Sequence, residues 1–233
     1  MKIGDVLRSA ADMVMPRACP VCGKALHADE RHLCRSCLEQ LPRTQFERTP
    51  FNAMEQLFAG KVPVERAAAY FWYEKGTDYS RIIIDMKYHG RQNLGRWLAA
   101  KAAAEMAQCG FFDGIDCVAA VPLHRDKKAS RGYNQSECIA RGICDATGLG
   151  MVNALTASYH ESQTRKDVFE RMVNARDIYH ASRSAERELA GRHVLIVDDV
   201  VTTGATLLAC AESLSGIRGL NVSLFALAAA RLE

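Results

Sequence analysis

The residues with the most evident chemistry stand in one run, HVLIVDDVVTTGATLLAC, at positions 193–210. Its apolar part predicts a buried strand that ends in two adjacent acids, Asp198 and Asp199. Small and hydroxylated residues follow at the start of a predicted helix: Thr202, Thr203, Gly204, Ala205 and Thr206. Small side chains let backbone N–H groups close around a phosphate, and the helix dipole favours its charge. The acids could merely cap the helix, but one acid suffices for capping, so the pair favours a ligand site.

A second loop concentrates positive charge after another predicted strand, IDCVAAVPL at 115–123. The loop PLHRDKKASRGYNQ carries four cations within seven residues: Arg125, Lys127, Lys128 and Arg131. Ligands bind outside the carboxyl ends of the strands in parallel sheets. We therefore expect this loop to border the same anion site as the acidic pair.

Strand and helix patterns alternate through the segments that must position these residues. Apolar runs predict strands at 64–73, 115–123, 193–199 and 221–230, and helical patterns cover 79–90, 94–108, 134–148 and 205–216. Gly148 stands where the third helix should end. This alternation predicts an α/β fold with a mainly parallel sheet.

Four cysteines form a separate group near the N-terminus. They are Cys19, Cys22, Cys34 and Cys37, in two CxxC pairs separated by eleven residues. Two such pairs can direct four thiolates at one tetrahedral ion, so the spacing predicts a closed, structural zinc site. Two disulfides or free thiols are the alternatives, but free cysteines favour apolar surroundings and this stretch is polar. His27 and His32 could substitute as ligands, although four cysteines already fill the coordination.

Composition sets the outer limits of these interpretations. The chain has 233 residues, 48% hydrophobic and 24% charged, which suits one medium domain with a small appendage. We expect a zinc module at residues 1–45 and the main domain at 46–233, because prolines and Gly60 mark a linker between them. The net charge of +3 does not by itself indicate nucleic acid. No apolar run is long enough to span a bilayer, so we expect a cytoplasmic protein.

Three other phosphate-binding classes are excluded, two by missing motifs and one by the length of the chain. The chain has no GxxxxGK[ST], which argues against a P-loop nucleotidase. No GxGxxG follows its first strand, which argues against the usual dinucleotide-binding site. A response-regulator receiver also has paired acids, but only 34 residues follow Asp199 here. That length is too short for the rest of such a domain.

The run VLIVDDVVTTGAT resembles the phosphoribosyl pyrophosphate signature of type I phosphoribosyltransferases. The wider pattern of CPVC and CRSC, MKYHG, VPLHRDKKASRGYNQ and SQTRKDVFERMVN is similar to the ComF family of competence-associated proteins. The resemblance covers nearly the whole chain. It implies a mainly parallel-sheet type I phosphoribosyltransferase fold with a small N-terminal zinc-binding module.

The resemblance also implies roles for individual residues. Asp198 and Asp199 would accept hydrogen bonds from the ribose hydroxyls, with Mg²⁺ bridging those hydroxyls and the pyrophosphate, and Arg171 would complete the catalytic group. The 5-phosphate turn would comprise Val200, Thr202, Thr203, Gly204, Ala205 and Thr206. The pyrophosphate side would comprise Pro122, Leu123, His124, Arg125, Arg131 and Lys87, the last of which could instead be a solvated surface lysine.

Segment 160–177 would serve as a lid that shields the reacting ribose from water. Gln163, Thr164, Arg171 and Asn174 match the family pattern there. The segment is highly charged and has little core pattern, as a mobile loop would be, but a merely exposed helix would be equally charged.

Two functions follow from the resemblance. The first is a phosphoribosyltransferase that binds phosphoribosyl pyrophosphate with Mg²⁺, transfers the phosphoribosyl group to an unknown acceptor and releases pyrophosphate. The second is an accessory protein of DNA uptake that binds a nucleotide, single-stranded DNA or a helicase partner without turnover. The zinc segment holds Lys24, Arg31 and Arg35 but no phenylalanine, tyrosine or tryptophan between its cysteines, which argues for a protein contact there. The chain could also form a homo-oligomer.

Overall fold

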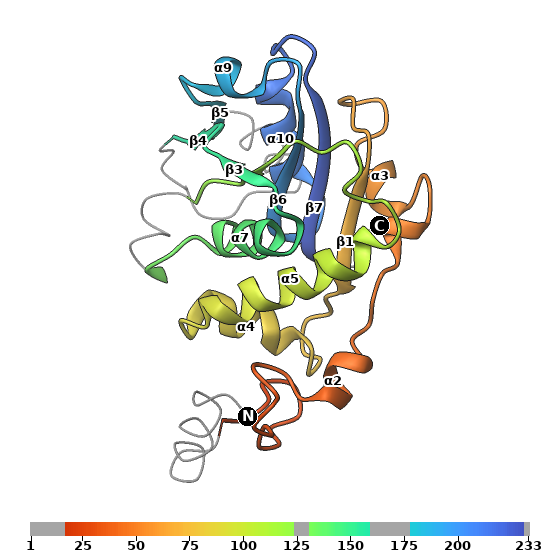
Figure 1. Cartoon of the computed structure of the whole chain (residues 1–233), viewed down its shortest axis with the longest axis vertical. Helices are drawn as coiled ribbons and strands as arrows, with labels where there is room; N and C mark the ends of the chain where they lie inside the picture. Colours follow the sequence, from red (N-terminus) through yellow and green to blue (C-terminus); the bar gives the residue numbers. More distant parts are fainter. Residues whose placement is uncertain (1–16, 124–130, 159–177, 231–233) are drawn as a thin grey trace.

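The chain folds around a five-stranded parallel sheet in a computed structural model that describes residues 17–123, 131–158 and 178–230 (Figure 1). The strand order is β1-β7-β6-β2-β3, and every pairing within it is parallel. The strands are β1 (Ala67–Trp72), β2 (Cys117–Ala120), β3 (Gly150–Val152), β6 (His193–Val201) and β7 (Asn221–Ala229). The predicted α/β fold with a parallel sheet is confirmed.

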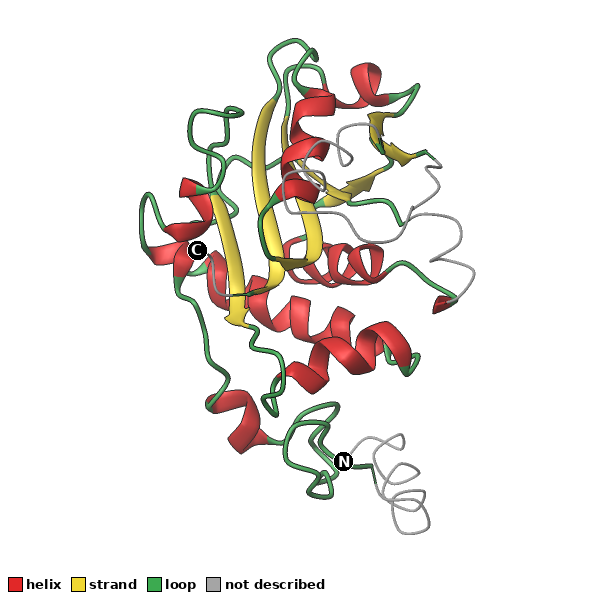
Figure 2. Ribbon diagram, turned by 180° about the vertical axis from the view of Figure 1, so that it is seen from behind, coloured by secondary structure: helices red, strands yellow, loops and turns green. Residues whose placement is uncertain are grey.

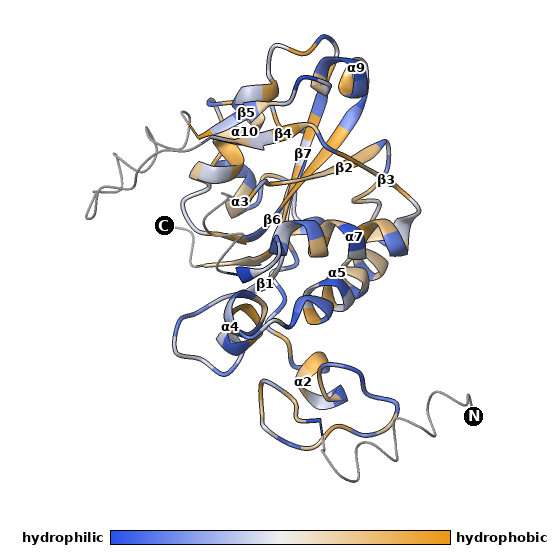
Figure 3. Cartoon of the chain, turned by 90° about the vertical axis from the view of Figure 1, so that its left-hand side faces the viewer, coloured by the Kyte–Doolittle hydropathy of each residue, from blue (hydrophilic) through white to orange (hydrophobic). Residues whose placement is uncertain are grey.

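Helices cover both faces of this sheet. Helix α7 (Gln135–Thr147) packs on β2 and β6 and carries α5 (Gln92–Ala107) on its outer side, while α10 (Ala205–Leu214) packs on β6 from behind (Figures 1 and 2). The sheet is therefore buried on both sides, which explains why β6 and β7 are nearly continuous apolar runs (Figure 3). Helix α7 ends before Gly148, whose φ of 77° is the left-handed conformation of a helix C-cap, as predicted.

Several short elements complete the described residues. A second sheet pairs β4 (Leu155–Ala157) with β5 (Tyr179–Ala181) in antiparallel fashion, and β5 packs against α10. The short helices are α2 (Arg35–Glu39), the 3-10 turn η1 (Phe46–Arg48), α3 (Ala53–Gln56) and α9 (Ala185–Leu189), and α4 (Ser80–Tyr88) precedes α5. None of the described helices combines the length and hydropathy that a membrane crossing requires.

The zinc module lies beside α4 and α5, away from the sheet (Figure 1). Hydrogen bonds help to hold it there: Arg43 donates to both carboxylate oxygens of Glu105 at 2.7 and 2.9 Å, and the Tyr79 hydroxyl donates to the Cys37 carbonyl at 3.2 Å. Residues 42–44 then run along β1, where Trp72 donates to the Pro42 carbonyl. The domain division at residue 45 stays a prediction.

The close packing of α5 on α7 depends on Gly142. A Cβ at this position would lie 2.1 Å from the Arg96 carbonyl oxygen, a backbone atom that cannot move without shifting α5. We expect Gly142→Ala to lower the free energy of unfolding by about 1–3 kcal/mol, measured by urea denaturation. Gly216→Ala is the matched control, because a Cβ there meets nothing within 4 Å. Equal stability of the two variants would contradict this account of the helix contact.

Candidate functional site

The acidic pair stands at the carboxyl end of the central strand β6. Asp198 is in register with Ala226 of β7, and the Val121 N–H at the end of β2 donates to the Val197 carbonyl at 2.9 Å. The ends of β2 and β6 therefore lie side by side. This juxtaposition brings the predicted loop at Pro122 and Leu123 next to the acidic pair.

Asp198 is held by its neighbours in a fixed position. Its Oδ1 accepts hydrogen bonds from the Ser136 hydroxyl at 3.0 Å and from the Asp199 N–H at 2.8 Å. Ser136 lies in the first turn of α7, whose cap residue Asn134 donates through Nδ2 to the Val121 carbonyl at 3.0 Å. The loop after β2 thus connects directly to the carboxylate on β6.

Burial and the neighbouring charge of Asp199 raise the pKa of Asp198 to about 7. The hydrogen bonds from the Asp199 N–H and Ser136, and the charge of Lys87, lower this pKa but do not offset the other causes. Burial raises the pKa of the nearby Tyr179 and Cys210 as well, with Asp198 contributing to both. Asp198 is therefore a carboxyl group poised between its two protonation states near neutral pH.

Lys87 brings a positive charge to the acidic pair. Its Nζ lies 3.1 Å from Asp199 Oδ2, and the two side chains are only 22% and 13% exposed. Lys87 belongs to the last turn of α4. Because its side chain is mostly covered and pairs with Asp199, it is not a solvated surface lysine. The structure places an ammonium group and two carboxylates together at the end of the sheet.

The Thr- and Gly-rich turn follows directly. Val200, Val201, Thr202, Thr203, Gly204, Ala205 and Thr206 line, with Asp198 and Leu207, a small cavity of about 40 Å³. Gly204 has a φ of 75° and precedes α10, and in the described residues no side chain caps this helix. The first N–H groups of α10 thus remain available to an anion.

Gly204 is required here for two reasons. A φ of 75° is strained for any residue with a Cβ, and a Cβ would meet the Phe58 ring at 3.2 Å. Phe58 and Leu57, from the chain after α3, form the floor beneath the turn. Both contacts join residues far apart in the sequence, so the pattern around Gly204 did not predict them.

Arg131 and Tyr133 lie on the α4 side of the loop. The Arg131 guanidinium sits 5.5 Å from the centre of the Tyr88 ring and donates to Gln135 at 3.3 Å. The Tyr133 hydroxyl donates to the Met86 carbonyl, next to Lys87. Tyr133 and Ser136 were not among the predicted site residues. Tyr133 stands in the predicted loop PLHRDKKASRGYNQ, and Ser136 follows that loop directly.

Several predicted site residues fall outside the described residues. They are His124, Arg125, Gln163 and Arg171, together with Lys127, Lys128, Thr164, Asn174 and the rest of the predicted lid at 160–177. Their roles stay predictions.

The four cysteines converge as their spacing predicts. Their Sγ atoms all lie within 4.8 Å of one another, and Cys22 and Cys34 are 3.7 Å apart. A disulfide needs about 2.05 Å between its sulfurs, whereas tetrahedral zinc with Zn–S distances of about 2.3 Å separates sulfurs by about 3.8 Å. The geometry fits a shared ion and excludes disulfides within the group.

Each half of the group is a short turn that aims its thiols inward. Gly23, with a φ of 74°, donates to the Cys19 carbonyl at 2.8 Å and lets the chain reverse behind Cys22. On the other half, Cys34 caps α2 and accepts from the Cys37 N–H. The hydrogen bond from the Lys24 N–H lowers the pKa of the Cys22 thiol to about 7. His32 lies against Trp97 instead of facing the cysteines.

Comparison with protein families defines the class of this chain. A model described as "Phosphoribosyl transferase domain" matches residues 95–231, and one described as "Double zinc ribbon domain" matches residues 10–48. The first match covers more than half of the chain, so the chain belongs to the phosphoribosyl transferase domain family. The second match and the converging thiols make the N-terminal module a zinc ribbon with a structural zinc site.

The chain is also similar to individual proteins. The chain is 27% identical to the DNA utilization protein YhgH of Escherichia coli K12 over 84% of this chain and 83% of that protein. It is 23% identical to competence protein ComFC of Streptococcus pneumoniae over 78% and 80%, and 27% identical to competence protein F of Haemophilus influenzae over 40% and 41%. These homologues confirm the resemblance to the ComF family.

Solved structures with a similar part are larger enzymes. One is the structure of the allosteric regulatory enzyme of purine biosynthesis. It is 23% identical to this chain, with a TM-score of 0.36, over 59% of this chain. Another is the glutamine phosphoribosylpyrophosphate amidotransferase of B. subtilis, with 22% identity and the same TM-score. The chain spans about a quarter of the length of each, 25% and 26%.

Proposed function

We propose that this protein binds phosphoribosyl pyrophosphate with Mg²⁺ and transfers the phosphoribosyl group to an acceptor with release of pyrophosphate. One observation carries the proposal: the pair Asp198 and Asp199 lies near the carboxyl end of β6, which ends at Val201, shortly before the uncapped N-terminus of α10 at Gly204. Two hydroxyl-binding carboxylates and a phosphate-binding turn are thereby separated by only a few residues. A ribose 5-phosphate has the matching groups at its two ends.

Each part of the site has a role in this proposal. Asp198 and Asp199 accept hydrogen bonds from the ribose hydroxyls, and the N–H groups and hydroxyls of 202–206 hold the 5-phosphate. Lys87 supplies positive charge for the pyrophosphate, which requires its ammonium to exchange Asp199 for the ligand. Pro122, Leu123 and Arg131 border the pyrophosphate from the loop after β2, as do His124 and Arg125 on the family pattern.

The carboxylates fit Mg²⁺, which favours oxygen ligands and keeps several positions for substrate phosphates and water. In the described residues only the four cysteines form a group of three or more ion-binding side chains, so oxygens of the ligand would complete any Mg²⁺ site at the acidic pair. When bound, Mg²⁺ would neutralise the departing pyrophosphate. The protein's own contribution is to hold the ribose and stabilise its developing positive charge, for which two adjacent carboxylates are suited.

A second candidate function is supported by the names of the relatives. They are called DNA utilization and competence proteins, and two of them match most of this chain. The second proposed function is that of a cytoplasmic accessory protein of DNA uptake. Such a protein would bind a nucleotide, single-stranded DNA or a helicase without catalysing a reaction. The five cysteines outside the zinc site form no disulfide, which agrees with a reducing compartment.

A calorimetric titration of the zinc-loaded protein with phosphoribosyl pyrophosphate and Mg²⁺ tests the proposal. We expect saturable binding that disappears in Asp198→Asn/Asp199→Asn, because the ribose hydroxyls lose both acceptors. The control is Asp78→Asn, an exposed acid 3.5 Å from Arg81, which should bind like the parent protein. Absence of binding by folded protein at millimolar ligand would overturn the proposal and favour the accessory function. Binding would justify a search for the acceptor by mass spectrometry.

A further inference from the structure

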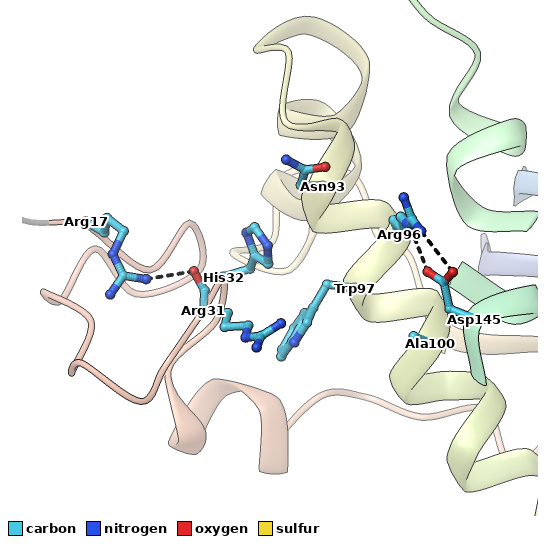
Figure 4. Close-up of a pocket in the computed structure, with 8 residues that line it drawn as sticks. All are labelled: Arg17, Arg31, His32, Asn93, Arg96, Trp97, Ala100 and Asp145. Atoms are coloured by element: carbon cyan, nitrogen blue, oxygen red, sulfur yellow. Dashed lines mark hydrogen bonds and ion pairs between the residues drawn. The ribbon is translucent and has the colours of Figure 1, made fainter. Parts of the chain in front are cut away.

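A second hollow lies between the zinc module and α5, and it shares no lining residue with the cavity at the acidic pair. Its volume is about 550 Å³, within the range of about 300–1,000 Å³ typical of small-molecule sites. The module contributes Arg17, Arg31 and His32, α5 contributes Arg96 and Trp97, and α7 contributes Asp145 (Figure 4).

The walls of this hollow are held in place by defined contacts. The Arg17 guanidinium donates to the Glu30 and Arg31 carbonyls at 2.7 and 3.1 Å. The module itself is fixed to α5 through the paired hydrogen bonds of Arg43 to Glu105. The hollow is therefore a built feature of the junction between the two parts.

Charge in the hollow favours an anion. Three arginines line it against one carboxylate, and that carboxylate is engaged: Arg96 donates to both oxygens of Asp145 at 2.6 and 2.9 Å. Arg17 and Arg31 lie on the opposite wall, and Arg31 is exposed. A guanidinium offers several donors in one plane, the geometry that phosphate groups accept.

Trp97 adds a flat apolar surface beside these charges. Its half-buried ring lies 5.6 Å from the His32 ring at a tilt of 57°, and Figure 4 shows the indole facing the space in front of Arg31. The zinc module has no phenylalanine, tyrosine or tryptophan between its cysteines, so this surface comes from the other domain. A base can stack on such a ring whatever its identity, because every base has a flat π-face.

We propose that this hollow is a nucleotide site in which the base stacks on Trp97 and the phosphate binds Arg17 and Arg31. The occupant is a free nucleotide or one nucleotide of a single strand, since both present the same ring and phosphate. The site is separate from the proposed phosphoribosyl pyrophosphate site and does not depend on it.

Binding of dAMP and of a short single-stranded oligodeoxythymidine to the zinc-loaded full-length protein tests this proposal. The measurement is made in the Asp198→Asn/Asp199→Asn background, so that the first site does not contribute. We expect saturable binding that weakens at least tenfold in Trp97→Leu and is largely kept in Trp97→Phe. Arg31→Ala should weaken binding and reduce its salt dependence, because one phosphate contact is lost.

Arg35→Ala is the matched control, because Arg35 is exposed on the same module, pairs with Asp29 and does not line the hollow. It should bind like the parent. Zinc content and thermal transition are measured for every variant, so that a displaced module is recognised. Binding of dAMP identifies a free-nucleotide site, and binding of the strand alone identifies a strand site. Failure of both ligands to bind, or equal binding by Trp97→Leu and Trp97→Phe, would overturn the proposal.

Discussion

Cys37→Ser is expected to release the zinc ion and unfold the N-terminal module while the main domain remains folded. In its described residues, from 17 on, the module has one five-residue helix and an isolated bridge between Ala18 and Ala25, and this secondary structure is too small to hold them together. Structural zinc contributes about 10–16 kcal/mol to folding in small zinc domains. Buried residues of the module and of the sheet form one continuous cluster, but most of that cluster belongs to the sheet and its covering helices, so we expect the main domain to stay folded.

Zinc content per chain and the fluorescence of Trp97 measure this effect, because Trp97 contacts His32 of the module. We expect one zinc ion per parent chain, a marked loss in the variant and a change in tryptophan emission as the module leaves α5. Cys109→Ser is the control, since Cys109 is half-buried and lies outside the cysteine group. A variant that keeps one tightly bound zinc would contradict the four-cysteine site.

Local patterns were sufficient to predict the elements that carry the site. Strand β6 reads as apolar residues from Val194 to Val197 because helices cover both faces of the parallel sheet. The CxxC pairs predict the zinc site because a short turn alone aims both thiols inward. Gly148 predicts the end of α7 because the helix C-cap depends only on the left-handed backbone conformation of that one residue.

Contacts between distant segments could not be predicted in this way. Ser136 and Asp198 are 62 positions apart, and nothing in either segment indicates that the first turn of α7 faces the end of β6. Trp97 faces the zinc module only because Arg43 and Tyr79 fix the module against α4 and α5. Strands β3, β4 and β5 have three residues each, too few to show a periodic pattern.

The position of Lys87 is another contact between distant segments that local sequence patterns could not predict. The sequence allowed either a surface lysine or a ligand contact, because a lysine near a helix end fits both. Packing of α4 decides between them, since it brings Nζ to 3.1 Å from Asp199. Basic and acidic groups that the sequence separates by more than a hundred positions thus form one site.

Asp198→Asn is expected to stabilise the protein at pH 8 and to abolish binding of phosphoribosyl pyrophosphate. The pKa of Asp198 is about 7 in the folded protein and about 3.9 in an unfolded chain. Between these values the native state holds a proton that the unfolded state has lost, so raising the pH lowers the free energy of unfolding. The loss is complete above the folded pKa and absent below pH 4.

The size of this effect follows from the difference between the two pKa values, which is worth at most about 4 kcal/mol. Asp198 is only half-buried, so water screens part of its charge, and we expect about 1–2 kcal/mol. Urea denaturation at several pH values should therefore show a variant that matches the parent at or below pH 4 and exceeds it by this amount at pH 8. The zinc site is common to both proteins and cancels in the comparison, and Asp78→Asn should follow the parent throughout.

Asp198→Asn would separate the two roles of this carboxylate if it raised the stability of the fold and abolished binding of the ligand. A carboxylate that weakens the fold but is required for the ligand is retained for its chemistry, the usual trade-off at functional sites. If Asp198→Asn is instead less stable than the parent at pH 8, the hydrogen bonds from Ser136 and the Asp199 N–H matter more than the buried charge. Asp198 would then be a structural link between α7 and β6, and the ribose contact would rest on Asp199.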